Sequence, residues 1–157
     1  FDLWLPGGNA IGSQTRFFSP AADTTLTIPS TARSAITVGA YDPRLSSYAS
    51  FSGRGYTRIL HEIKPDLAAP GVNIPAPRSG GGYASFTGTS FAAPFVSGSA
   101  ALMMEWGILR GNDPFLYGEK LKAYLIAGAK PIASESEYPN RRVGWGALCT
   151  AQSLFHM

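Results

Sequence analysis

The sequence predicts an α/β fold, because stretches typical of strands precede stretches typical of helices. Between residues 24 and 86, short runs of β-favouring residues end at proline or glycine turns. Gly88 then leads directly into an apolar run from Ser90 to Trp106, which has the length and composition of a buried helix. A second helical pattern follows around Leu121 and Leu125. We therefore expect one medium-sized domain in which strands and helices share a core.

Six segments have the composition of strands, and most of them end at turn residues: 1–5, 15–18, 24–28, 35–41, 64–72 and 83–86. The first leads into a turn cluster at 6–9, and the last leads into the turn at Gly88. The segment 64–72 is expected to end in a turn at Gly71, and 48–55 to alternate briefly and then turn.

Three helices are expected in the second half of the chain. The first is almost wholly apolar or small through Met104, which predicts protein on all its sides, and Gly107 can end it. The next is predicted to be capped by Asn112 or Asp113 and to end at Gly128. A glycine-rich turn over 142–148 then leads into a final helix that ends near Leu154.

The composition narrows the classes of function. The 157 residues carry 13 basic and 10 acidic side chains, and the resulting charge of +3 is scattered, which gives no indication of nucleic-acid binding. Pro94 and Gly98 interrupt the apolar run, which favours a core helix over a membrane span. Cys149 is the only cysteine, so no intrachain disulfide is possible, and its neighbours indicate a small buried thiol.

Ser90 is the strongest candidate for a catalytic residue. Gly88 permits a backbone conformation that a side chain would oppose, and Pro94 requires the helix to begin close to Ser90. A hydroxyl at this position lies beside unpaired backbone N–H groups and the positive end of the helix dipole, which suits a nucleophile whose reaction develops negative charge. The same local pattern also fits a serine that only caps the helix.

The stretch Gly88-Thr89-Ser90-Phe91-Ala92-Ala93-Pro94, followed by Gly98, resembles the nucleophile motif of the subtilisin-like serine proteases, the subtilases. The resemblance extends over residues 24–154 and implies that 1–157 is the carboxy-terminal part of one subtilase catalytic domain. The implied fold is a three-layer sandwich with a mainly parallel sheet between helices.

The resemblance also implies roles for particular residues. Ser90 would attack the scissile peptide carbonyl, and its own backbone N–H would help hold the oxyanion. Thr27 and Ile28 would lie near the pocket for the side chain that precedes the cleaved bond. Thr87, Gly88 and Thr89 would border the substrate cleft.

The sequences of residues 4–6, 51–55 and 105–108 resemble those of a clostridial subset of this family. That subset includes spore-germination proteases and members that have lost catalytic residues. By this similarity we expect a secreted or spore-associated bacterial protein.

Two partners of the nucleophile have no match in this sequence. Subtilases place an aspartate followed by glycine and a histidine followed by glycine and threonine before the serine, and neither context occurs here. We interpret His61 as a solvated loop residue and His156 as part of the carboxy-terminal end. Asn9 is a candidate for the oxyanion asparagine, but a role in its glycine turn is the preferred interpretation. No metal or cofactor site is predicted.

These observations leave three hypotheses. The leading one is a serine endopeptidase fragment that acts on a peptide or protein substrate, needs the N-terminal part of the same domain as its partner, and is inactive and poorly soluble alone. The second is a catalytically incomplete subtilase fold that binds or regulates another protein. The third is an independent binding domain in which Ser90 is only a cap. No membrane or nucleic-acid partner is expected under any of them.

Overall fold

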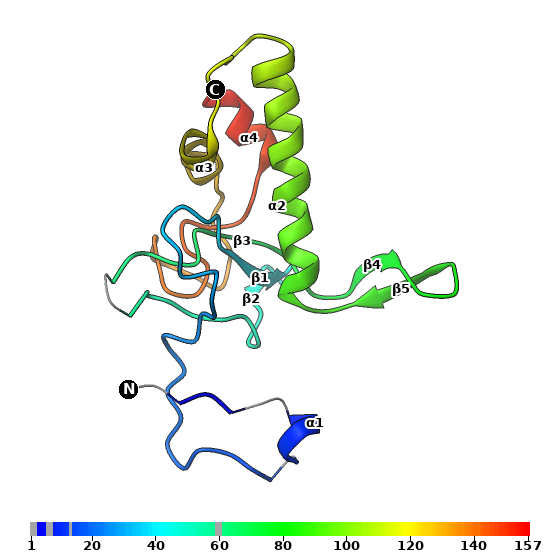
Figure 1. Cartoon of the computed structure of the whole chain (residues 1–157), viewed down its shortest axis with the longest axis vertical. Coiled ribbons are helices and arrows are strands. Elements are labelled where there is room, and N and C mark those ends of the chain that lie inside the picture. The colour runs from blue at the N-terminus through cyan, green and yellow to red at the C-terminus, as the bar shows by residue number, and fades with distance from the viewer. Residues whose placement is uncertain (1–2, 6–7, 13, 59–60) are drawn as a thin grey trace.

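A computed structural model describes residues 3–5, 8–12, 14–58 and 61–157. It confirms the α/β fold: a long helix crosses a small sheet, and two shorter helices lie beside the upper half of that helix (Figure 1). The sheet holds β1 (Val38–Asp42), β2 (Ser47–Tyr48) and β3 (Leu67–Pro70) in the order β2-β1-β3.

One pair in this sheet is parallel and the other is antiparallel. In the parallel pair β1–β3, Val38 lies opposite Leu67 and Ala40 opposite Ala69. The β1–β2 pair is antiparallel, with Tyr41 opposite Tyr48. The strand expected over 35–41 is present over 38–42, and the strand expected over 64–72 is present over 67–70.

The hairpin of β4 (Ile74–Pro77) and β5 (Tyr83–Phe86) projects from the base of the long helix (Figure 1). Its three consecutive glycines, 80–82, all have positive φ angles, which lets the chain reverse at the tip. β5 is the strand predicted to lead into the Gly88 turn.

The long helix is α2 (Thr89–Met104), and it continues as a π-helical turn, η1 (Glu105–Leu109). Small residues let α2 approach the sheet closely: Ala40, Ala69 and Ala92 are fully buried in one core cluster. The expectation that Gly107 ends the helix is wrong. Gly107 lies inside η1, which continues to Leu109. The position is tightly packed, because a Cβ added at Gly107 would lie 2.9 Å from the Cε of Met157.

The expectation that α2 is surrounded by protein on all sides is also wrong for the described chain. β1, β3 and α4 contact the helix, and its buried residues form one arc: Ala92, Val96, Ser99 and Met103. The remaining surface carries exposed apolar side chains, including Phe95 and Leu102, because no described segment covers them. By length and composition alone, Thr89–Leu109 could also cross a membrane, but core helices of soluble proteins meet the same criterion.

The second half ends in α3 (Gly118–Ala127) and α4 (Thr150–Phe155), which pack against each other. As the sequence predicts, Gly128 follows the end of α3. The last helix, α4, ends at Phe155, one residue after the predicted Leu154. The predicted cap is wrong, because the carboxylate of Asp113 binds Lys120 at 2.6 Å instead of backbone N–H groups and Tyr117 is the cap.

The predicted strands 15–18 and 24–28 are not strands, and the described residues of the segment 1–5 are not strand either. Residues 1–2, 6–7 and 13 lie outside the described part; residues 3–5 and 15–18 are irregular, and α1 (Gly8–Ile11) occupies the predicted turn. Residues 24–28 make only a two-bond ladder, from the N–H groups of Thr24 and Thr25 to the carbonyls of Gly55 and Arg54. The ladder stops at Thr25, before the chain reaches Pro29.

Candidate active site

Ser90 lies in the first turn of α2, directly after a glycine turn that is anchored to the sheet. The N–H of Gly88 donates to the carbonyl of Gly71, at the end of β3, over 2.8 Å. Gly88 has φ 157°, a value that residues with side chains rarely adopt.

Gly71 makes this anchoring possible. A Cβ at Gly71 would lie 2.6 Å from the Cβ of Ala40 and 3.1 Å from the carbonyl oxygen of Gly88. The hydroxyl of Thr87 adds a second tie by accepting the N–H of Asn73 at 3.0 Å. Two turns from different parts of the sequence therefore fix where α2 and Ser90 begin.

Ser90 does not cap the helix. Gly88 occupies the capping position, and no side chain of the described residues bonds the first N–H groups of α2. The Ser90 side chain is exposed, and its hydroxyl makes no hydrogen bond within the described part of the chain. The hypothesis that Ser90 is present only as a cap is therefore wrong.

A pocket of about 770 Å³ opens beside Ser90. Thr89, Ser90 and Ala93 of α2 line one side. The other side comes from the segment between residues 22 and 38 and from the turn over 50–54. Thr27, predicted near the substrate pocket, thus shares this pocket with Ser90 and Thr89.

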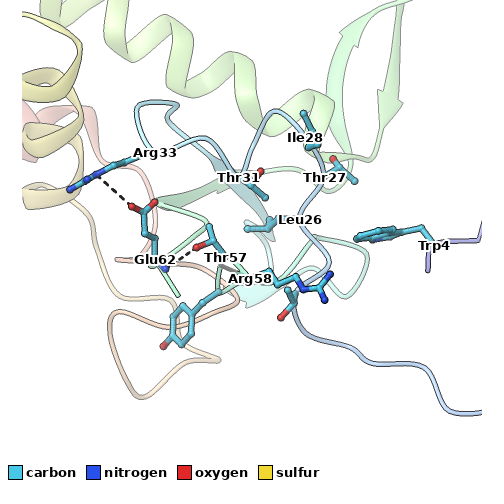
Figure 2. Close-up of a pocket in the computed structure, with 11 residues that line it drawn as sticks. Trp4, Leu26, Thr27, Ile28, Thr31, Arg33, Thr57, Arg58 and Glu62 are labelled. Carbon is cyan, nitrogen blue, oxygen red and sulfur yellow. Dashed lines mark hydrogen bonds and ion pairs between the residues drawn. The ribbon is translucent and has the colours of Figure 1, made fainter. Parts of the chain in front are cut away.

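Ile28 lies on the far side of the same segment. Its side chain is 89% exposed and lines a second pocket of about 570 Å³, together with Trp4 and Leu26 (Figure 2). Arg33 and Glu62 form an ion pair of 3.5 Å at the rim of this second pocket. Leu26 and Thr27 line both pockets, so this short stretch separates them. Thr87 and Gly88 line neither pocket and stay at the helix junction.

The described chain supplies no acid or base beside Ser90. Among the described residues that line its pocket, none is histidine, aspartate or glutamate. His61 is exposed on the loop before β3, and His156 is exposed at the end of α4. Asn9 belongs to α1, and its role in holding an oxyanion stays a prediction.

Among the described residues that line the pocket, Arg54 is the one with a charge, and the sequence did not single it out. Its Nε donates to the hydroxyl of Tyr48 at 3.2 Å, and its guanidinium lies 3.9 Å from the carboxylate of Asp23. The bond to Tyr48 raises the pKa of Arg54, so the side chain stays charged. Its place in the turn over 50–54 was the only sequence signal for this position.

Comparisons with known proteins converge on one family. A family model described as "Subtilase family" matches residues 7–146. Serine protease AprX of Bacillus subtilis is 37% identical over 150 residues, which cover 83% of this chain and 32% of that protein. The minor extracellular protease Vpr of the same organism is 35% identical over 107 residues, which cover 63% of this chain and 12% of Vpr.

Solved structures give the same result. The structure of the Clostridium perfringens CspB protease matches with a TM-score of 0.84 and 48% identity over 89% of this chain, but over 30% of that chain. The maturation protease PagA matches with a TM-score of 0.71 and 31% identity, over 86% of this chain and 46% of that chain. The subtilisin-like fold is therefore shown. The chain spans about a third of the length of AprX and of the CspB structure.

Proposed function

This chain belongs to the subtilase family, and we propose that it carries the nucleophile, Ser90, of a subtilisin-like serine endopeptidase. The observation that carries the proposal is the position of Ser90. Its exposed hydroxyl, which has no hydrogen bond within the described residues, lies in the first turn of α2, and Ser90 lines a pocket of about 770 Å³.

The helix start also supplies a place for negative charge. The first N–H groups of a helix have no intrahelical acceptor, and the helix dipole is positive there. The N–H of Phe91 donates to the carbonyl of Gly88 at 3.1 Å, whereas the N–H of Ser90 has no acceptor among the described residues and could donate to an oxyanion. Such preorganised donors stabilise the tetrahedral intermediate of acyl transfer.

The proposed reaction is acyl transfer through Ser90. A base removes the proton of the Ser90 hydroxyl as Oγ bonds to the peptide carbonyl carbon. The C–N bond then breaks, and the amine leaves with that proton. Water hydrolyses the resulting ester, which returns the free serine and a carboxylic acid.

The base and the acid that orients it would come from the N-terminal part of the same domain. The exposed surface of α2 supports this partner. Small residues at Pro94, Ser97, Gly98 and Ala101 flank the exposed Phe95 and Leu102, so another element can approach closely and bury apolar area. The chain covers only about a third of AprX and of the CspB structure, which leaves room for such a segment.

A fluorophosphonate tests the proposal, because the Ser90 oxygen displaces fluoride from phosphorus only when a base activates it. In the full-length protein we expect labelling at Ser90, found by mass spectrometry of the peptides. Labelling should disappear in Ser90→Ala and persist in Ser97→Ala, which removes another exposed serine of α2.

The other outcomes separate the alternatives. An unlabelled Ser90 in the folded full-length protein would favour the catalytically incomplete binding or regulatory protein. Labelling of residues 1–157 alone at the full rate would contradict a base supplied from another part of the domain.

A further inference from the structure

We propose that Lys64, Asp66 and Lys122 position the wall of the Ser90 pocket formed by residues 27–37, and that they govern substrate binding without touching the substrate. This inference rests on the proposed function for its substrate. Its structural part can be tested separately.

The three side chains form a buried charged cluster from two parts of the sequence. The Nζ of Lys64 lies 2.8 Å from Oδ2 of Asp66, and the Nζ of Lys122 lies 2.8 Å from Oδ1. The exposed fractions of the Lys64 and Asp66 side chains are 1% and 4%, and that of Lys122 is 17%. Burying a charged side chain destabilises the folded state unless the charge is paired and hydrogen-bonded. A cluster with two cations and one anion therefore needs further hydrogen-bond partners.

Those partners are the backbone of the wall. The Nζ of Lys64 donates to the carbonyl of Ala35 at 2.6 Å. The Nζ of Lys122 donates to the carbonyl of Arg33 at 3.0 Å and to that of Ala35 at 3.3 Å. Both ammonium groups therefore hold the same short stretch of backbone.

Asp66 holds the end of the wall. Its Oδ2 accepts the N–H of Thr37 at 2.6 Å, and its own N–H donates to the carbonyl of Thr37 at 2.8 Å. The Thr37 hydroxyl donates to the carbonyl of Ser30, and the N–H of Ser30 donates to the carbonyl of Thr27 at 2.8 Å. A continuous set of hydrogen bonds thus runs from the charged cluster to Thr27.

The wall lines the pocket of Ser90 through Thr27, Pro29, Ser30, Ala35, Ile36 and Thr37. Lys122, by contrast, lies in α3, which packs on α4 and lines no part of that pocket. Lys122 therefore reaches the wall from outside the pocket, through its Nζ bonds to the carbonyls of Arg33 and Ala35. Lys122 is accordingly a positioning residue.

Lys122→Met is the test, with Lys120→Met as the matched control. Lys120 lies in the same helix and pairs with Asp113 at 2.6 Å, but makes no contact with the wall. Lys122→Met leaves Lys64 and Asp66 as a balanced pair, so the protein should still fold. Lys122→Arg keeps the charge and should rescue.

Two measurements are made on the full-length protein. Hydrogen exchange followed by mass spectrometry should speed up in peptides that cover 27–37 in Lys122→Met and stay unchanged there in Lys120→Met. For a peptide substrate, Lys122→Met should raise KM about three- to tenfold with kcat changed less than about twofold, as expected for lost uniform binding.

Unchanged exchange in 27–37 would overturn the positioning role, whatever the activity. Faster exchange with an unchanged KM would overturn the link to substrate binding. Faster exchange in a protein whose wild type cleaves no peptide would instead contradict the proposed function and leave the positioning role standing. If Lys122→Met fails to fold while Lys122→Arg folds like wild type, the cluster is needed for folding itself and the positioning proposal is overturned.

Discussion

The two sides of the Ser90 pocket are held in place by different forces. The side with Ser90 is fixed by backbone contacts between two glycine turns, where the N–H of Gly88 donates to the carbonyl of Gly71 and a side chain at Gly71 would have no room. The opposite side, 27–37, is irregular and is held by a buried charged cluster that includes Lys64 and Lys122. The first side should therefore be disrupted by adding atoms where the backbones touch. The second side should be disrupted by removing one charged side chain of the cluster.

Gly71→Ala should break the first side and has the largest expected effect on stability. The added Cβ would lie 2.6 Å from the Cβ of Ala40, which is fully buried and cannot move away cheaply. We expect a loss of about 1–3 kcal/mol in the free energy of unfolding, as for other overpacked sites. Chemical denaturation of the full-length protein measures it.

Gly118→Ala is the control for this prediction. Gly118 starts α3, is exposed, and has nothing within 4 Å of an added Cβ. Alanine should be neutral there or stabilise by up to about 1 kcal/mol. Equal effects of the two substitutions would show that the contact between Gly71 and the Gly88 turn is not tight.

Lys122→Met tests the charged cluster on the second side. Its expected effect, a change in the pKa of Lys64, is smaller than the effect of Gly71→Ala. Burial lowers the pKa of Lys64, Asp66 opposes that change, and the neighbouring charge of Lys122 lowers the pKa further. Removing Lys122 should therefore raise the pKa of Lys64, which NMR titration of labelled lysine side chains detects.

The sign for stability follows from proton binding. The unfolded chain keeps an ordinary lysine pKa, so between the lowered pKa and 10.5 it binds more protons than the folded state. The contribution of Lys64 to the free energy of unfolding rises with pH through this window. In Lys122→Met the pH range between the pKa of Lys64 and 10.5 should narrow. An unchanged or lower pKa of Lys64 would contradict the electrostatic interaction between the two lysines.

The sequence predicts the first side well because its determinants are local. The turns at Gly71 and Gly88, the strands before them and the start of α2 each follow from adjacent residues. The second side depends on Lys122, Asp66 and Ala35, which only the fold brings together, and a lysine next to a proline gives no sign of being 1% exposed.

The other misses have the same cause. Asp113 resembles a helix cap in sequence, but Lys120 and Tyr124 take its carboxylate once α3 is formed. The apolar composition of α2 predicted burial all round, whereas the described chain covers one arc of it. In each case contacts in the folded chain decide the outcome: side chains 7 and 11 residues away bind Asp113, and no described segment covers the rest of α2.

The central claim is that Ser90 is a nucleophile, and the kinetics of Ser90→Ala in the full-length protein test it most directly. We predict that kcat/KM for a peptide substrate falls at least about a thousandfold, while the thermal midpoint stays close to that of wild type because the hydroxyl has no partner within the described chain. Ser97→Ala should remain within about twofold of wild type, since that position lies away from the pocket. A Ser90→Ala protein that cleaves the substrate as fast as wild type would contradict the account.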